Sequence, residues 1–196
     1  QGRLEEAIET QRHAILLDPL AATYHVNLGH MLMVAGQTRE AEAALEKALS
    51  ISARPRAFFA YDFAVARILR SEFEAALALV PDMEAMEDRI AVRAMVAHGY
   101  GHSASAEELS DQLEVLNGVR AIVRLAEVRS YRGNPAAVSD ALDQLESVLA
   151  VREEGLPVAG QALLELRHSP FIGELYAEAT LIQRFGEIFV SYYTAD

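Results

Sequence analysis

The sequence predicts an all-α protein built from stacked antiparallel helix pairs, and three observations support this fold class. Ala, Leu, Glu and Arg, which are strong helix formers, are prominent along the whole chain. The 196 residues include only 11 Gly and 6 Pro, too few for a loop-rich β protein or a disordered chain. The third observation is an internal repeat with a period of 34 residues.

The repeat becomes visible when residues 1–19 are compared with residues 35–55. Self-similarity at this period is typical of stacked helical hairpins. Antiparallel helices that cross closely need small side chains where their backbones approach, so we expect Gly29 to face Ala41. Three small residues recur at the spacing of the repeat: Gly2 as Gly36, Ala7 as Ala41, and Ala14 as Ala48.

Residues 22–55 carry further apolar and small residues at fixed offsets: Leu28, Gly29, Leu32, Ala41, Leu45 and Ala48. These offsets resemble the seventh, eighth, eleventh, twentieth, twenty-fourth and twenty-seventh positions of the tetratricopeptide repeat, a family of paired antiparallel helices A and B. Gly36 falls in the turn between the helices, and His25 replaces the usual aromatic residue at the fourth position. The resemblance implies a right-handed superhelical solenoid of about five helix pairs with a C-terminal cap.

We divide the chain into repeat-like helices over residues 1–155 and a C-terminal helical cap over residues 156–196. The first part comprises an unpaired helix B at 1–19, the clear repeat at 20–55, and degenerate repeats over 56–155. An unpaired helix B leaves uncovered the face that its partner should cover. We therefore expect either that the chain is part of a longer protein or that this helix pairs with a second copy in a homodimer.

The unit after the clear repeat has a looser pattern. Phe63-Ala64 stand 35 residues after Leu28-Gly29, which implies a one-residue insertion. Pro81 would fall inside helix B and remove a hydrogen bond, so we expect that helix to be short and to end near Val80. Later elements are predicted as a helix pair at 86–101 and 105–116, a further pair over 119–151 joined by a Gly-Asn-Pro turn, and three shorter helices over 157–193.

The segment LLELRHSPFIGELYAEATLIQRF, residues 163–185, loosely resembles the end of repeat regions in bacterial multidomain signalling proteins. In those proteins such tails follow nucleotide cyclase or winged-helix regulator domains. The resemblance implies a regulatory or sensory repeat segment of a larger bacterial protein. The alternative is that the segment caps the last hydrophobic face, which every solenoid must cover.

Charge and composition argue against several classes of function. With 29 acidic against 17 basic residues, the net charge is −12, which argues against nucleic acid or an anionic membrane surface as a partner. No apolar run approaches the ~18 residues of a transmembrane helix. The absence of Cys removes disulfides, thiolate nucleophiles and Cys-based zinc sites, and it suits a cytoplasmic protein.

The tetratricopeptide resemblance also implies a binding surface, because proteins of this family usually hold peptides in a concave groove lined by their A helices. The side chains at the matching positions favour an apolar or amphipathic segment, and Met adapts readily to varied partners. Acidic residues around the groove would steer a basic flank of the partner. We therefore predict a protein-interaction scaffold whose groove residues are Thr23, Val26, Asn27, His30, Met33, Val34, Phe58, Tyr61, Asp62 and Val65.

One known binding mode of the family does not fit this groove. Chaperone-binding members clamp a C-terminal carboxylate with an Asn in one A helix and basic residues in the next. Asn27 matches the first role, but Phe58 and Asp62 occupy the basic positions. A carboxylate near Asp62 would be repelled.

A metal-dependent enzyme is the alternative from a different functional class. His98 and His102 are four residues apart, a spacing that on a helix could bind zinc with Glu107 or Glu108 as an oxygen ligand. The two Gly residues between them weaken such a helix, and the Glu that follows the first His in zincins is absent. No nucleophile elbow or Gly-rich phosphate loop occurs. We therefore predict no enzyme activity, no metal and no cofactor.

Overall fold

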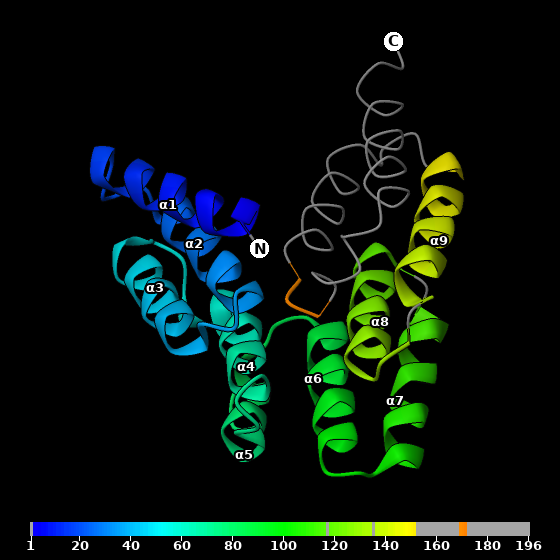
Figure 1. The fold of residues 1–196 in the computed structure, drawn as a ribbon. Helices are drawn as coiled ribbons and strands as arrows, with labels where there is room; N and C mark the ends of the chain where they lie inside the picture. Colours follow the sequence, from blue (N-terminus) through cyan, green and yellow to red (C-terminus); the bar gives the residue numbers. More distant parts are fainter. Residues whose placement is uncertain (1, 117, 135, 152–168, 172–196) are drawn as a thin grey trace.

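The structure is a computed structural model, and it describes residues 2–116, 118–134, 136–151 and 169–171. These residues form helices, turns and loops (Figure 1). Two short 3-10 turns, η1 (Arg56–Phe59) and η2 (Val80–Asp82), precede and follow the helices of the second pair. The α-helices are α1 (Gly2–Leu17), α2 (Ala22–Val34), α3 (Thr38–Ile51), α4 (Ala60–Ile68), α5 (Phe73–Leu77), α6 (Met86–Gly99), α7 (Ser103–Leu116), α8 (Val119–Tyr131) and α9 (Ala137–Val151).

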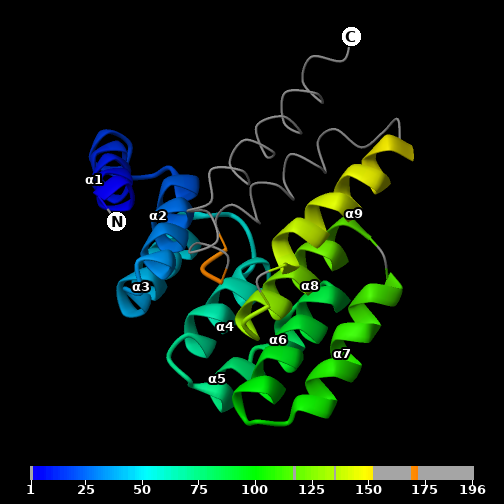
Figure 2. The ribbon, with the colours of Figure 1, turned by 45° about the vertical axis from the view of Figure 1, so that its right-hand side comes forward.

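The described helices are arranged as successive pairs. After α1, which packs on α2, the pairs are α2 with α3, α4 with α5, α6 with α7, and α8 with α9. We call the first member of each pair, α2, α4, α6 or α8, an A helix; α4 contacts α6, and α6 contacts α8. Figure 2 shows the same succession from α1 at one end to α9 at the other. The all-α fold of paired helices predicted from the sequence is therefore confirmed.

The first pair crosses at a glycine, as the sequence predicts. A Cβ atom on Gly29 would lie 3.0 Å from Cγ and Cδ2 of Leu45 and 3.3 Å from the carbonyl oxygen of Ala41. Ala41 and Leu45 are fully buried. Gly36 forms the turn between α2 and α3 with a φ of 74°, a left-handed conformation that favours glycine.

The second pair is short, and its first helix is deeply buried. Its helix α4 has nine residues, of which seven are buried, including Phe63 and Ala64 at the positions equivalent to Leu28 and Gly29. Helix α5 has five residues and ends at Leu77, so the predicted end near Val80 is wrong by three residues. The reason is Pro81, which lies in the first turn of the separate 3-10 turn η2, where its missing N–H group is not needed.

A bulky side chain joins this short pair to the next one. A Cβ atom on Gly99, at the end of α6, would overlap the ring of Phe73 from α5. The same ring makes an edge contact with Tyr100, with ring centroids 5.0 Å apart. Gly99 therefore leaves the space that the Phe73 ring fills, in addition to weakening the helix as its sequence context suggests.

The later pairs agree with the sequence prediction. Helices α6 and α7 occupy the ranges predicted at 86–101 and 105–116, within two residues at each boundary. Helices α8 and α9 are joined by a turn in which Gly133 has a φ of 80°. The cap predicted over 156–196, with its three shorter helices, lies outside the described residues except for 169–171.

Candidate functional site

The ten predicted groove residues have three levels of exposure along α2, η1 and α4. Met33 and Val65 keep only 3% and 2% of their surface exposed, so they pack the core between helices. Tyr61, at 8%, is buried as well. The three exposed residues are Thr23, Asn27 and Phe58; the four partly exposed ones are Val26, His30, Val34 and Asp62; the three buried ones are Met33, Tyr61 and Val65.

Exposed polar and aromatic side chains gather where α2 lies beside α4. His30 Nε2 lies 3.1 Å from Asp62 Oδ1, and each of the two side chains is 24% exposed. Asn27 precedes His30 by three residues, about one helical turn, and so faces the same side of α2. Phe58, 51% exposed, precedes Asp62 by four residues, and the Arg54 guanidinium lies 4.0 Å from its ring centroid. We call the side of the molecule along which the A helices lie next to one another the A-helix face, and Asn27, His30, Phe58 and Asp62 its open end.

A second polar cluster joins α4, α6 and α8, and it is buried. The Tyr61 hydroxyl donates a hydrogen bond of 2.7 Å to Glu127 Oε2. Arg124 donates from Nη1 to the same oxygen at 2.9 Å, and from Nε to Asp88 Oδ1 at 2.6 Å. Its guanidinium carbon also lies 3.8 Å from the centroid of the Tyr61 ring. We call these four residues, of which none is more than 8% exposed, the closed end.

Burial sets the electrostatics of the closed end. Desolvation raises the pKa of Glu127, against the opposing effects of the Arg124 charge and of the hydrogen bonds from Tyr61 and Arg124. Burial and then the Glu127 charge raise the pKa of Tyr61 well above its ordinary value. Tyr61 therefore stays neutral near pH 7 and keeps its hydroxyl proton as a donor.

The closed end was not among the predicted site residues apart from Tyr61, although the sequence carries a signal for it. Arg124 and Glu127 stand three residues apart in α8, so they share one face of that helix. Every residue from 121 to 128 is buried. Opposite charges three residues apart within such an apolar stretch indicate a buried ion pair, which Asp88 from the first turn of α6 extends.

A short segment from later in the chain lies against the closed end. Ser169 is 2% exposed, and its hydroxyl lies beside the Glu127 carboxyl group. The Phe171 ring makes an edge contact with Tyr131 of α8, with centroids 5.2 Å apart and ring planes at 69°. In Figures 1 and 2 this segment, drawn in orange, lies between α8 and the helices α2 and α4. Residues 169–171 therefore cover part of the A-helix face.

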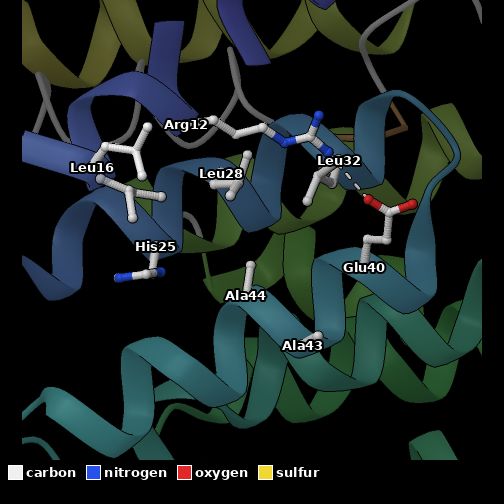
Figure 3. Close-up of a pocket in the computed structure, with 9 residues that line it drawn as sticks. Arg12, Leu16, His25, Leu28, Leu32, Glu40, Ala43 and Ala44 are labelled. Atoms are coloured by element: carbon white, nitrogen blue, oxygen red, sulfur yellow. Dashed lines mark hydrogen bonds and ion pairs between the residues drawn. The ribbon is translucent and has the colours of Figure 1, made fainter. Parts of the chain in front are cut away.

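A separate hollow of about 520 Å³ lies between α1, α2 and α3 (Figure 3). Arg12 reaches over it from α1 and pairs with Glu40 of α3 at 3.2 Å. None of the ten predicted groove residues lines this hollow. The sequence pattern does not predict this hollow, because its size depends on the distance between α1 and α3. Its remaining lining is mostly apolar: Ile15, Leu16, His25, Leu28, Leu32, Ala43 and Ala44.

His98 and His102 lie on either side of the end of α6. The helix ends at Gly99, and Gly101 turns the chain with a φ of 79°. The His98 ring packs edge-on against Tyr131, with centroids 5.6 Å apart. Within the described ranges, no group of three His, Asp or Glu side chains is placed to hold a metal ion. No helix in the same part of the chain combines the length and apolar character that a membrane span requires.

Comparison with known proteins bears on the first helix pair. Residues 22–55 match the tetratricopeptide repeat family, and they comprise α2, α3 and the loop that follows. The match confirms the resemblance inferred from the spacing of Leu28, Gly29 and Ala41. Repeats of this family typically act as non-enzymatic scaffolds for protein–protein interaction. No curated protein matches the chain.

Proposed function

We propose that this chain, in which residues 22–55 are a tetratricopeptide repeat, is a protein-interaction scaffold that holds an apolar or amphipathic segment of a partner at its open end. The observation that carries the proposal is the position of the exposed side chains. Asn27 and His30 belong to the A helix of the matched repeat, on the side that lies beside the next A helix. Peptide recognition in a groove between helices uses side chains of this kind.

The chemistry of the open end indicates which partner would fit. Phe58 offers a half-exposed aromatic ring, which contributes contact area at low cost in conformational entropy. Asn27 can both donate and accept hydrogen bonds, so it can fix the register of a peptide backbone. Asp62 adds negative charge to a chain that already carries −12, which favours a basic residue flanking the apolar segment.

The buried members of the predicted set have a supporting role in this proposal. Met33, Tyr61 and Val65 lie in the core, where they hold α2 and α4 in position. A charged substitution at any of them would unfold the pair, because burying an unpaired charge is costly. Tests of binding should therefore use the exposed residues.

The experiment is a comparative pull-down from an extract of the source cell. The test variant is Asn27→Glu/Phe58→Glu, which places two carboxylates at the open end at positions that are themselves exposed. The matched control is Ala43→Glu, which places a carboxylate at an exposed position of α3 beside the hollow of Figure 3. Thermal unfolding of the three proteins checks that both variants remain folded.

We expect partners recovered by the wild type to be lost from the double variant and retained by Ala43→Glu. The opposite pattern, loss only with Ala43→Glu, would move the binding surface to the hollow between α1 and α3. Equal recovery by all three folded proteins would contradict binding at the open end.

A further inference from the structure

A second hollow, of about 460 Å³, lies between the end of the short second pair and α6. Its apolar wall consists of Leu77 at the end of α5 and of Val80 and Pro81 in η2, and its basic wall consists of Arg89 and Arg93 on α6. Figures 1 and 2 show α5 beside α6. We infer that this hollow, which we call the arginine hollow, binds an acidic peptide segment of a protein partner, in which Glu or Asp stands next to an aliphatic residue.

The two arginines are held so that they present charge to the hollow. They stand four residues apart on α6, which places both on one face of the helix. Arg89 donates from Nε to the Met83 carbonyl oxygen at 2.7 Å, and its Nη2 lies 3.5 Å from the Glu84 carbonyl oxygen. Backbone carbonyls are neutral acceptors, so they orient the Arg89 guanidinium without cancelling its charge.

Within the part of the chain that the structure describes, neither guanidinium is paired with a carboxylate. Arginines of the neighbouring helix are: Arg67 and Arg70 of α4 both pair with Glu42, at 3.0 and 2.7 Å. Arg93 is exposed and Arg89 is half-buried, so both can be reached from solvent. In a chain with 29 acidic and 17 basic residues, this pair is a local reversal of charge. The arginine hollow is therefore complementary to an anion.

The acidic surroundings restrict the kind of anion. Asp82 and Glu84 are exposed and follow the apolar wall in the sequence, and the whole chain carries a net charge of −12. A nucleic acid or an anionic membrane would bring many negative charges against this surface and be repelled. A single carboxylate can accept charge-assisted, bidentate hydrogen bonds from a guanidinium without that repulsion. An isolated Glu or Asp therefore suits the hollow better than a polyanion does.

The apolar wall adds the requirement for an aliphatic neighbour. Leu77 is 37% exposed, and Pro81 is exposed as well. An aliphatic side chain placed against them removes apolar surface from water, which a small anion alone cannot do. The volume of the hollow lies within the range of about 300–1,000 Å³ found for ligand pockets. A Leu beside a Glu would use both walls at once.

The inference goes beyond the proposed function and does not rest on it. The open end, with Asn27 and Phe58, favours a basic flank of a partner, whereas the arginine hollow favours an acidic segment. Among the described residues, none of those that line the arginine hollow belongs to the open end. Failure of the pull-down with Asn27→Glu/Phe58→Glu would leave this inference standing, and failure of the titration described next would leave the open end standing.

The test is an NMR titration of the isotope-labelled full chain with two short peptides. The probe is acetyl-Leu-Glu-Leu-amide, whose blocked ends carry no terminal charge. The matched control is acetyl-Leu-Gln-Leu-amide, which has the same shape without the carboxylate. We expect the Glu peptide to shift the Nε–H signals of Arg89 and Arg93 and the amide signal of Leu77. The Gln peptide should bind about ten times more weakly, because it lacks the charge-assisted hydrogen bond.

Two variants test whether the position of the charge matters. Arg93→Gln removes one guanidinium from the hollow, and Arg39→Gln makes the same change at an exposed position of α3. We expect the affinity for the Glu peptide to fall about tenfold in Arg93→Gln and to stay close to that of the wild type in Arg39→Gln. Thermal unfolding checks that both variants fold. If Arg93→Gln does not fold, the comparison of the two peptides on the wild type decides.

Several results would overturn the inference. Equal binding of the Glu and Gln peptides would show that apolar contact alone accounts for the affinity. Equal weakening in Arg93→Gln and Arg39→Gln would show that the peptide responds only to the net charge of the protein. Sodium acetate that shifts the same signals at the same concentrations as the Glu peptide would show a site for small anions rather than for a peptide. Unchanged signals of Arg89, Arg93 and Leu77 would show that nothing binds in the hollow.

Discussion

The polar side chains at the two ends of the A-helix face differ in their exposure to solvent. At the open end, His30 and Asp62 meet at 3.1 Å while each keeps 24% of its surface in solvent. At the closed end, Arg124 and Glu127 meet at 2.9 Å with side chains only 7% and 5% exposed. The distances are similar, so burial decides what each contact does. Breaking the buried ion pair would leave an uncompensated charge in the core, whereas the His30–Asp62 contact keeps a quarter of each side chain in solvent and accessible to a partner.

The apolar contacts differ between the ends as well. The first pair is held by a close crossing, in which Leu45 packs against Gly29. Where α4, α6 and α8 meet, the crossing is bridged by charges and by the Tyr61 hydroxyl. We therefore expect charge removal to destabilise the closed end and overpacking to destabilise the crossing of α2 and α3.

The largest effect is expected from Arg124→Met. Methionine is long and apolar, but it leaves Glu127 and Asp88 buried without the cation that joins them. Removing one partner of a buried ion pair costs about 3–5 kcal/mol. Urea unfolding followed by circular dichroism should show this loss of unfolding free energy.

The control for that prediction is Arg120→Met. Arg120 pairs with the same Asp88, at 3.3 Å, but its side chain is 47% exposed. An exposed pair contributes about 0–1 kcal/mol, so this variant should unfold close to the wild type. Equal losses in the two variants would show that burial does not separate structural from accessible charges in this face.

A smaller loss is expected from Gly29→Leu at the crossing of α2 and α3. Even a Cβ atom there would approach Leu45 to 3.0 Å, so a full leucine side chain must push α2 away from α3. Overpacking of this kind costs about 1–3 kcal/mol. Thermal unfolding of Gly29→Leu against Gly29→Ala tests it, since the alanine adds only a Cβ atom, close to Leu45 and to the Ala41 carbonyl oxygen, and should cost less than the full leucine side chain. An unchanged melting temperature in Gly29→Leu would remove the crossing as the reason for the glycine.

The fold was largely predictable from the sequence, because the spacing of small residues in the repeat indicates where the backbones of two helices come close together. Gly29 and Ala41 stand at offsets that recur in any close antiparallel pair, so their contact follows from the sequence. The role of Gly99 does not, because Phe73 reaches it from a different pair and no repeat offset links them. The candidate site was predictable only in part for the same reason. Family positions identify which residues lie on A helices, but the hydrogen-bond partner of Tyr61 is Glu127, 66 residues away, which no repeat offset indicates.

The closed end should also give the protein a specific pH dependence. Burial raises the pKa of Glu127 in the folded chain, so the folded state binds a proton that the unfolded state has released. Stability contributed by this group is therefore fully present below its unfolded pKa, near 4.5, and is lost as pH rises through the raised folded pKa. Each unit of difference between the two pKa values corresponds to about 1.4 kcal/mol.

The measurement compares the wild type with Glu127→Gln, because other carboxyl groups titrate in the same range. We expect the wild type to gain stability relative to the variant as pH falls through this window, measured by urea unfolding at closely spaced pH values. A difference that stays constant with pH would show that Glu127 has the same pKa in the folded and unfolded chain.

The smallest effect on stability is expected from His30→Ala, and it is the most direct probe of the contrast between the two ends. The His30–Asp62 contact keeps a quarter of each side chain in solvent, so its loss should change the unfolding free energy by less than about 1 kcal/mol. If the open end meets a partner, the same variant should nevertheless lower partner recovery in the pull-down. Retained stability with reduced recovery would separate binding from folding at this residue, which Arg124→Met cannot do because its own fold is weakened. A stability loss as large as that of Arg124→Met would place His30 among the structural residues and leave Asn27 and Phe58 as the accessible side chains of the open end.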